Sequence, residues 1–266
     1  MILHSIKLGN FRNYENIEVS LSNGINIIYG DNAQGKTNLL ESIYVLALTK
    51  SHRSFIDHNL IKDEKQISKV SGRVEKNGIS TNYEVVIEQK KKKCFIDGNE
   101  IKKLSDYISN LNIVIFYPED LEIIKGAPDL RRRYINMEIS QLDRNYFTIL
   151  NDYNRLLKMR NDSLKNMTSF SGLEHPYFSA LTEYLIEKAA FLYKMRMKFI
   201  KKLNDNCERI FKDISGKDKF HIKYESTFIL ENMTIEEIKE ILKQKFNEGK
   251  YQEYKLRTTI IGPHKD

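Results

Sequence analysis

Apolar residues in the first 120 positions recur mostly at the two-residue spacing that is typical of β-strands. Residues 17–21 alternate between apolar and polar side chains, and the turn pair Asn23-Gly24 follows them. The next stretch, residues 25–29, is apolar and rich in β-branched side chains, which predicts a buried strand. Further strands are predicted at residues 1–7, 67–74, 80–88, 94–97 and 113–116. We therefore expect this part of the chain to be mainly β.

From about residue 129 the apolar positions change to helical spacing. Residues 146–164 and 181–203 each carry an apolar stripe, which predicts two long amphipathic helices separated by a loop at residues 169–176. The two helices could pair in an antiparallel coiled-coil-like arm, or they could form an ordinary helical subdomain with the stripes as its core. The pattern favours neither arrangement over the other.

The last part of the chain mixes strand and helix signals. A strand is predicted at residues 220–224. The capping box at residues 234–237 predicts the start of a helix that runs to about Phe246, with Gly249 as its end signal. Residues 256–261 again have the pattern of a strand.

The segment from Gly30 to Thr37 has the complete pattern of a phosphate-binding loop, G-x-x-x-x-G-K-[ST], which a chain of this length contains by chance in roughly 1% of cases. Glycines let the backbone curl so that successive N–H groups point at phosphate oxygens. Lys36 would contact the β- and γ-phosphates, the Thr37 hydroxyl would bind Mg²⁺, and the helix that follows would add its positive dipole end. The predicted nucleotide-binding residues are Gly30, Asp31, Asn32, Ala33, Gln34, Gly35, Lys36 and Thr37.

Bulk properties limit the class of protein. The chain has 266 residues, enough for one elaborate domain or two, and no apolar stretch of the roughly 18 residues that a membrane span needs. Its start lacks the features of a signal peptide. Cys94 and Cys207 are far apart, and the six histidines are scattered, so no zinc site is expected. We expect reduced thiols and a cytoplasmic location.

The net charge of +7 is weak evidence for a polyanionic partner such as DNA. A lysine run at residues 90–93 lies between two predicted strands, where a solvated hairpin tip is the more common explanation. Three arginines follow a predicted turn at residues 126–129 and could present a rigid basic cluster. The candidate DNA-binding residues are Lys91, Lys92, Arg131, Arg132 and Arg133.

Short motifs spread over the whole chain carry a family resemblance. They are residues 8–14 (LGNFRNY), 30–41 (the phosphate loop and its helix), 50–53 (KSHR), 116–121 (FYPEDL), 125–128 with the three arginines after it, and 262–266 (GPHKD). In this order they resemble the RecF family of bacterial recombinational-repair ATPases, which belongs to the SMC-like branch of ABC-type ATPases.

The resemblance implies an α/β fold, an ABC-type P-loop ATPase head with a mixed sheet around the P-loop helix and a helical, coiled-coil-like insertion domain. The head lobe would span residues 1–128, the insertion 129–257, and a return strand into the head 258–266. ATP and Mg²⁺ would be the cofactors. Arg12, Asn13 and Asn38 would lie near the nucleotide, although Arg12 could instead pair with a carboxylate. Residues 118–120 would approach the γ-phosphate as a Q-loop equivalent, or simply start a helix.

The resemblance also implies an ATP-dependent DNA-binding protein of recombinational repair, replication and the SOS response. Members of this kind would bind double-stranded DNA and junctions of single- and double-stranded DNA near gaps. They would act with RecR and RecO in loading RecA, and would form an ATP-dependent homodimer when full length.

The chain also departs from the family pattern. It has no signature segment, no Walker B run ending in paired carboxylates and no D-loop. We therefore expect a C-terminally truncated piece of a weak ATPase, with no catalytic residue in it and little hydrolysis.

Two other functions fit part of the sequence. A P-loop kinase for a small metabolite would usually have its loop on the first strand, whereas 29 residues precede Gly30 here. An SMC-like structural arm protein would need much longer helices, since each predicted helix of 20 to 30 residues spans only about 30–45 Å.

Overall fold

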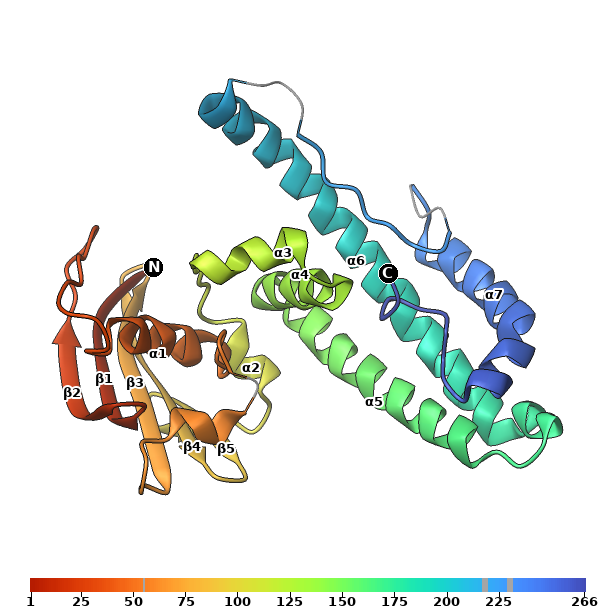
Figure 1. The fold of residues 1–266 in the computed structure, drawn as a ribbon, viewed down its shortest axis with the longest axis horizontal. Coiled ribbons are helices and arrows are strands. Elements are labelled where there is room, and N and C mark those ends of the chain that lie inside the picture. Colours follow the sequence, from red (N-terminus) through yellow and green to blue (C-terminus); the bar gives the residue numbers. More distant parts are fainter. Residues whose placement is uncertain (55, 217–219, 229–231) are drawn as a thin grey trace. The chain divides into compact units, whose positions relative to one another are not determined.

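The computed structural model describes residues 1–54, 56–216, 220–228 and 232–266 (Figure 1). The chain forms two compact units, Met1–Phe116 and Tyr117–Asp266. The division falls before the predicted domain limit at residue 128, because the short helices after Tyr117 pack with the helix that begins at Pro128. The assignment of residues 1–128, 129–257 and 258–266 to parts of an ATPase head stays a prediction.

A six-stranded sheet organises the first unit, with strand order β2-β1-β3-β4-β5-β6 and antiparallel pairing throughout the described strands. Two of its tight turns are Asn77-Gly78 and Asp97-Gly98, where all four residues have positive φ, a conformation that asparagine, aspartate and glycine tolerate. The strands are β1 (Ile2–Phe11), β2 (Tyr14–Ser20), β3 (Ile67–Lys76), β4 (Ile79–Glu88), β5 (Lys92–Ile96) and β6 (Asn99–Glu100).

One face of this sheet is covered by α1 (Lys36–Leu48) (Figure 1). Alternate strand residues such as Ile6, Val70 and Val85 are fully buried on this face. The helix approaches so closely that a Cβ atom on Gly72 would lie 2.6 Å from Leu46 Cδ2. The unit also contains the 3₁₀ turn η1 (Asp57–Leu60) and the short helix α2 (Ser105–Ile108). The core of this unit therefore lies between the sheet and α1.

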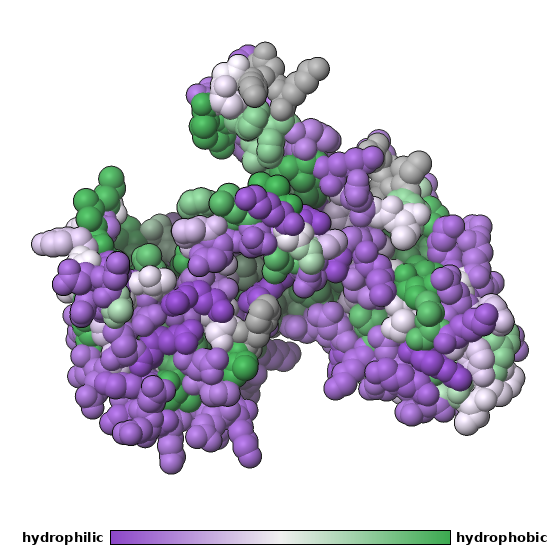
Figure 2. All heavy atoms as spheres, in the orientation of Figure 1, coloured by the Kyte–Doolittle hydropathy of each residue, from purple (hydrophilic) through white to green (hydrophobic). Residues whose placement is uncertain are grey.

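Two predicted strands of the first unit are absent from its sheet. Residues 25–29 and 113–116 have no strand conformation and leave large apolar side chains exposed, for example Ile25 at 88% and Val114 at 86%. Figure 2 shows hydrophobic residues on the loop that follows β2. The predictions were wrong because β-branched composition indicates only a preference, and no described strand pairs with either segment.

Helices make up the second unit. The amphipathic helices predicted at residues 146–164 and 181–203 are confirmed, and the second is much longer than expected, with 40 residues. The helical elements are η2 (Pro118–Leu121), α3 (Glu122–Lys125), α4 (Pro128–Leu142), α5 (Arg144–Asn166), η3 (Phe170–Glu174), α6 (Pro176–Ser215) and α7 (Ile235–Leu256). None of the described helices combines the length and apolar character that crossing a membrane requires.

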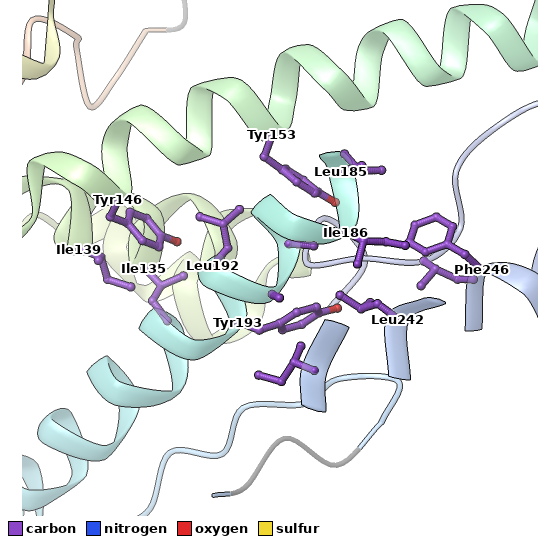
Figure 3. Close-up of a cluster of buried hydrophobic side chains, with 14 residues drawn as sticks. Ile135, Ile139, Tyr146, Tyr153, Leu185, Ile186, Leu192, Tyr193, Leu242 and Phe246 are labelled. Carbon is purple, nitrogen blue, oxygen red and sulfur yellow. The ribbon is translucent and has the colours of Figure 1, made fainter. Parts of the chain in front are cut away.

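Helix α6 lies at the centre of the second unit and packs against α5 and α7 (Figure 1). A shared core of buried side chains comes from α4, α5, α6 and α7, and Tyr146, Tyr153 and Tyr193 are among its largest members (Figure 3). Because four helices share this core, α5 and α6 form part of a helical subdomain. They are not an isolated two-helix arm.

Three predictions in the last part of the chain were wrong. The predicted strand at residues 220–224 does not form. Instead, Ile222 N donates to Asn204 Oδ1, and Asn204 Nδ2 donates to the carbonyl of Ile222, each at 2.8 Å. The predicted capping box at residues 234–237 is confirmed, but α7 continues past Gly249, where a Cβ would lie 2.9 Å from Ile261 Cδ1. The strand predicted at residues 256–261 is absent, because side chains of α5 and α7 satisfy this backbone instead.

Candidate nucleotide-binding site

The loop from Gly30 to Thr37 has a backbone that only a few residue types can adopt. Gly30, Ala33 and Gly35 have φ values of 145°, 65° and 99°. Gly35 is also closely covered, since a Cβ there would lie 2.7 Å from Asn13 Nδ2 and 2.8 Å from the Tyr14 hydroxyl. A side chain at Gly35 would therefore meet both backbone strain and a steric clash.

The amino end of α1 leaves backbone donors available for an anion. The first hydrogen bond of the helix runs from Leu39 N to Gly35 O at 2.9 Å, so the amides of residues 36–38 precede the helical pattern. Lys36 folds back over the loop, and its ammonium donates to the carbonyl oxygens of Gly30 at 2.7 Å and Asp31 at 2.6 Å. The loop at the amino end of α1 thus combines a positive charge with backbone amides, the two kinds of group that a phosphate site requires.

The donors in this loop fit a triphosphate. Amides at a helix amino end, an ammonium group and a glycine-rich backbone are all donors to phosphate oxygens, and ATP bound here would supply the phosphoanhydride bond. The exposed Thr37 hydroxyl, at the first turn of α1, is the group that would hold Mg²⁺. Within residues 1–54, 56–216, 220–228 and 232–266, no cluster of three or more His, Cys, Asp or Glu side chains could hold a metal by itself.

Arg12 points its guanidinium at a buried carboxylate. Its Nε and Nη2 donate to the two oxygens of Glu41 at 2.9 Å and 2.7 Å, and its Nη1 donates to the carbonyl of Asn59 at 2.7 Å. Glu41 is fully buried in α1, whereas Arg12 follows β1. The pair therefore ties the end of β1 to the P-loop helix, and contact between Arg12 and a nucleotide stays a prediction.

Glu41 accepts further hydrogen bonds and charges from the loop after α1. Ser51 Oγ donates to it at 2.5 Å, and Arg53 Nη1 lies 3.7 Å from its other oxygen. Burial raises the pKa of Glu41, but the hydrogen bonds from Arg12 and Ser51 and the nearby positive charges outweigh it, so the pKa lies below its ordinary value. Glu41 is thus an ionised anchor between three segments.

A chain of polar contacts links this anchor to the phosphate loop. Asn38 donates to Asn13 Oδ1 at 2.9 Å and accepts from Arg53 Nη1 at 3.1 Å. Asn13 in turn covers Gly35. The predicted site residues Asn13 and Asn38 are therefore brought together beside the loop. Sequence reasoning assigned no role to Glu41, Ser51 or Arg53, although all three lie in motifs that carried the family resemblance.

The predicted basic cluster in α4 is largely engaged with its own unit. Arg131 Nη1 donates to the carbonyls of Ile123 at 3.1 Å and Gly126 at 3.0 Å, at the end of α3. Arg132 donates to the carbonyl oxygen of Asp266. Arg133 is half-buried. Since two of the three arginines hold backbone carbonyls, DNA binding by this cluster stays a prediction without support from its geometry.

The lysine run lies at the turn between β4 and β5, as expected for a hairpin tip. Lys91 pairs with Glu88 at 3.4 Å, and Lys92 pairs with Asp57 at 2.8 Å and donates to the carbonyl of Thr49. Both candidate DNA-binding lysines thus have partners within the first unit. Their contact with DNA stays a prediction.

Residues 118–120 begin a short helix, which is the simpler of the two interpretations of this motif. They form the first part of η2, and the carboxylate of Asp120 accepts from Tyr117 N at 3.0 Å. The approach of these residues to a γ-phosphate stays a prediction.

The motif at residues 262–266 packs in the core of the second unit. Gly262 has a φ of 131°, and a Cβ there would lie 2.5 Å from the Tyr153 hydroxyl. Arg196 is buried and donates to the carbonyl of Pro263 at 2.6 Å. The Tyr153 hydroxyl lies 2.6 Å from His264 Nδ1. Burial lowers the pKa of His264 to about 4. This motif therefore fastens the end of the described chain to α5 and α6.

Comparison with known proteins gives the family. The AAA ATPase domain family matches residues 1–262. Two proteins called DNA replication and repair protein RecF, from Listeria monocytogenes serotype 4b (strain CLIP80459) and Shouchella clausii (strain KSM-K16), are 43% and 40% identical to this chain over 267 and 270 residues. Each alignment covers 100% of this chain and 72% of the relative. The chain belongs to the RecF family.

Solved RecF structures share this fold. A structure of the recombination mediator protein RecF-ATP in the RecFOR pathway has a TM-score of 0.90 and 32% identity, and covers 99% of this chain and 72% of that chain. A second one, described as RecF-ATPrS, has a TM-score of 0.90 and 31% identity, with 99% and 71% coverage. The predicted fold class, an α/β ABC-type ATPase head with a helical domain, is thereby confirmed.

Proposed function

We propose that this RecF-family chain binds ATP at the loop from Gly30 to Thr37 and acts as an ATP-dependent DNA-binding protein in replication and recombinational repair. The single observation that carries the proposal is the intact phosphate loop at the amino end of α1, with Lys36 folded over it. The likeness to RecF-ATP supports ATP as the nucleotide.

The finer parts of the proposal rest on the family assignment. The DNA substrate is duplex DNA and its junctions with single strands, where the protein helps to load RecA together with RecO and RecR. ATP promotes association of two copies, and Thr37 holds Mg²⁺ at the phosphates. The protein acts in the cytoplasm, including during the SOS response. The names of the relatives and of the RecFOR structures support the role in replication and repair and the connection with RecO and RecR.

Replacing Lys36 with alanine tests ATP binding. The ammonium makes charge-assisted contacts with phosphate oxygens, which are worth about 1.5–3 kcal/mol, so affinity should fall by about 10- to 100-fold. The measurement is a titration with labelled ATP in the presence of Mg²⁺. Lys102→Ala is the matched control, because Lys102 is an exposed lysine in the same unit and its side chain has no hydrogen bond or ion pair among the residues that the structure describes. Equal affinity of Lys36→Ala and Lys102→Ala would reject the assignment.

Duplex DNA binding is tested separately, with and without ATP. The intact chain is titrated into a labelled duplex carrying a single-strand gap and into a fully paired control. Tighter binding to the gapped duplex in the presence of ATP supports the proposal. Absence of DNA binding in both conditions contradicts it.

A further inference from the structure

The sheet face opposite α1 contains a polar hollow. Its volume is about 630 Å³, and it is lined from adjacent strands by residues that include Ser5, Ser71, Arg73 and Asn82. Strand alternation places these side chains on the face away from the core, since Ile6, Val70 and Val85 point the other way. Unlike the covered face, this face presents mostly hydroxyl, amide and charged groups.

Strand register arranges these groups in a row around Arg73. Ser5 of β1 and Asn82 of β4 lie directly opposite Arg73 of β3. Ser20 of β2 lies opposite Ser5 and extends the row to the edge strand. Neighbouring strands are about 4.8 Å apart, so two hydroxyls, a guanidinium and an amide follow one another at this spacing.

Both acidic residues that line the hollow are already neutralised. Glu18 pairs with Lys7 at 3.5 Å, and Glu84 pairs with Lys69 at 2.7 Å. The side chain of Arg73, by contrast, has no hydrogen bond or ion pair with any residue that the structure describes, and the residue is exposed. The hollow therefore has an excess of positive charge.

Lys93 adds a second uncompensated charge to the same face. It is two residues from Phe95, which lines the hollow, while Cys94 between them is buried on the other side. In the described part of the chain, Lys93 has no ion-pair partner, in contrast to Lys91 and Lys92. Register and strand spacing put the Cα atoms of Arg73 and Lys93 roughly 16 Å apart.

The chemistry of this face suits a chain of phosphates. Arginine, lysine, serine and asparagine side chains are the usual donors to phosphate oxygens in complexes with nucleic acid. Two free cations separated by this distance suit different phosphates of one backbone better than a single small anion. The few apolar side chains in the hollow offer little for a hydrophobic protein interface.

We propose that the outer face of the sheet, around Arg73 and Lys93, docks backbone phosphates of duplex DNA without regard to sequence. This inference rests on the proposed DNA-binding function and gives it a location, in place of the partnered cationic side chains of Lys91, Lys92, Arg131 and Arg132.

The double variant Arg73→Glu/Lys93→Glu tests the location. Binding of a labelled duplex is measured in the presence of ATP at several salt concentrations. Loss of two phosphate contacts should lower the slope of log K against log salt by about 1.8, which is about 0.9 for each contact. Binding should weaken equally for unrelated sequences. Lys102→Glu/Lys103→Glu is the matched control, because it changes the net charge equally at exposed lysines outside the sheet.

Each outcome decides the question. An unchanged slope in Arg73→Glu/Lys93→Glu, or an equal fall in the control, overturns the location while DNA binding itself stands. Failure of the unchanged chain to bind DNA overturns the proposed function as well. Binding of a labelled acidic peptide is measured in the same way. If Arg73→Glu/Lys93→Glu loses binding to this peptide but still binds duplex DNA as the unchanged chain does, the face belongs to an acidic protein partner and the inference is overturned.

Two further measurements check that the variants fold as the unchanged chain does. ATP affinity and the thermal unfolding curve should match those of the unchanged chain. If charge reversal disturbs the sheet, Arg73→Gln/Lys93→Gln replaces it, and the slope should again fall. Arg73→Lys should retain the slope, because a lysine still neutralises one phosphate.

Discussion

Glu41 is the residue on which the surroundings of the phosphate loop depend. It is buried, it holds Arg12 through two hydrogen bonds, and it also accepts from Ser51. A buried carboxylate is stable only when its charge is matched and its oxygens are bonded, and these partners satisfy both conditions. The arrangement explains why a glutamate can occupy the buried side of α1, where an apolar residue would be expected.

Substituting Glu41 with glutamine should destabilise the first unit and change its response to pH. Removing the charge leaves the Arg12 guanidinium without its partner in a mostly buried place, at a cost of about 3 kcal/mol. Because the pKa of Glu41 is lowered by folding, its contribution is present above the ordinary value of 4.5 and is lost as the pH falls through the folded pKa. In denaturant unfolding, the free energy of unfolding should therefore decrease less between pH 7 and pH 3 in Glu41→Gln than in the unchanged chain. An identical decrease in the two proteins would mean that Arg12 and Glu41 do not form the ion pair.

At the scale of elements, buried polar contacts determine how the helices of the second unit fit together. Arg160 of α5 is almost fully buried and donates to Glu253 of α7 at 2.6 Å, to Thr259 at 2.7 Å and to Thr182 of α6 at 3.0 Å. The rings of Phe178 and Phe246 lie 4.7 Å and 4.8 Å from its guanidinium carbon. One side chain thus joins three helices and the segment after α7.

A double-mutant cycle on Arg160 and Glu253 should show strong coupling. Arg160→Met leaves the Glu253 carboxylate buried without its cation, and should cost about 3–5 kcal/mol of unfolding free energy. Arg160→Met/Glu253→Leu removes both charges, and should be more stable than either single variant. Denaturant unfolding of the four proteins supplies the cycle. Additive losses in the double variant would show that the two side chains act independently.

The predictions from sequence succeeded for elements whose signal is local. The stripe on α6 and the capping box at Thr234 depend on residues three or four positions apart, so they were found correctly. Residues 25–29 have an equally clear strand composition, but a strand forms only when another chain segment pairs with it. Gly249 was predicted to end α7, although Ile261 packs directly over it and the helix continues.

At the scale of the whole molecule, the chain has two compact units with separate cores. The first unit contains the sheet, α1 and the phosphate loop, whereas the second contains the helices and the motif at residues 262–266. Each core is closed by contacts within its own unit, such as Arg12 with Glu41 and Arg160 with Glu253. Separate cores are the usual basis for separate unfolding transitions.

We therefore expect two thermal transitions, each sensitive to a different variant. Glu41→Gln should lower one midpoint by several degrees, and Arg160→Met should lower the other, since about 3 kcal/mol shifts the midpoint of a domain of this size by roughly 10 °C. ATP with Mg²⁺ should raise only the transition that Glu41→Gln lowers. Differential scanning calorimetry provides the measurement. A single transition that both variants lower equally would show that the two units unfold as one.

The sequence by itself determined the phosphate loop, the family and the amphipathic helices. These features depend on residue types at short, fixed spacings. The phosphate-loop motif can therefore be recognised without knowledge of the contacts that distant segments make. Only the tertiary structure decided that Arg12 binds Glu41 and that α7 continues past Gly249. It also decided that the side chains of Lys91 and Lys92 have partners, whereas those of Arg73 and Lys93 have none among the residues that the structure describes. Those outcomes depend on contacts between residues far apart in the chain, and such contacts form only when folding brings the segments together.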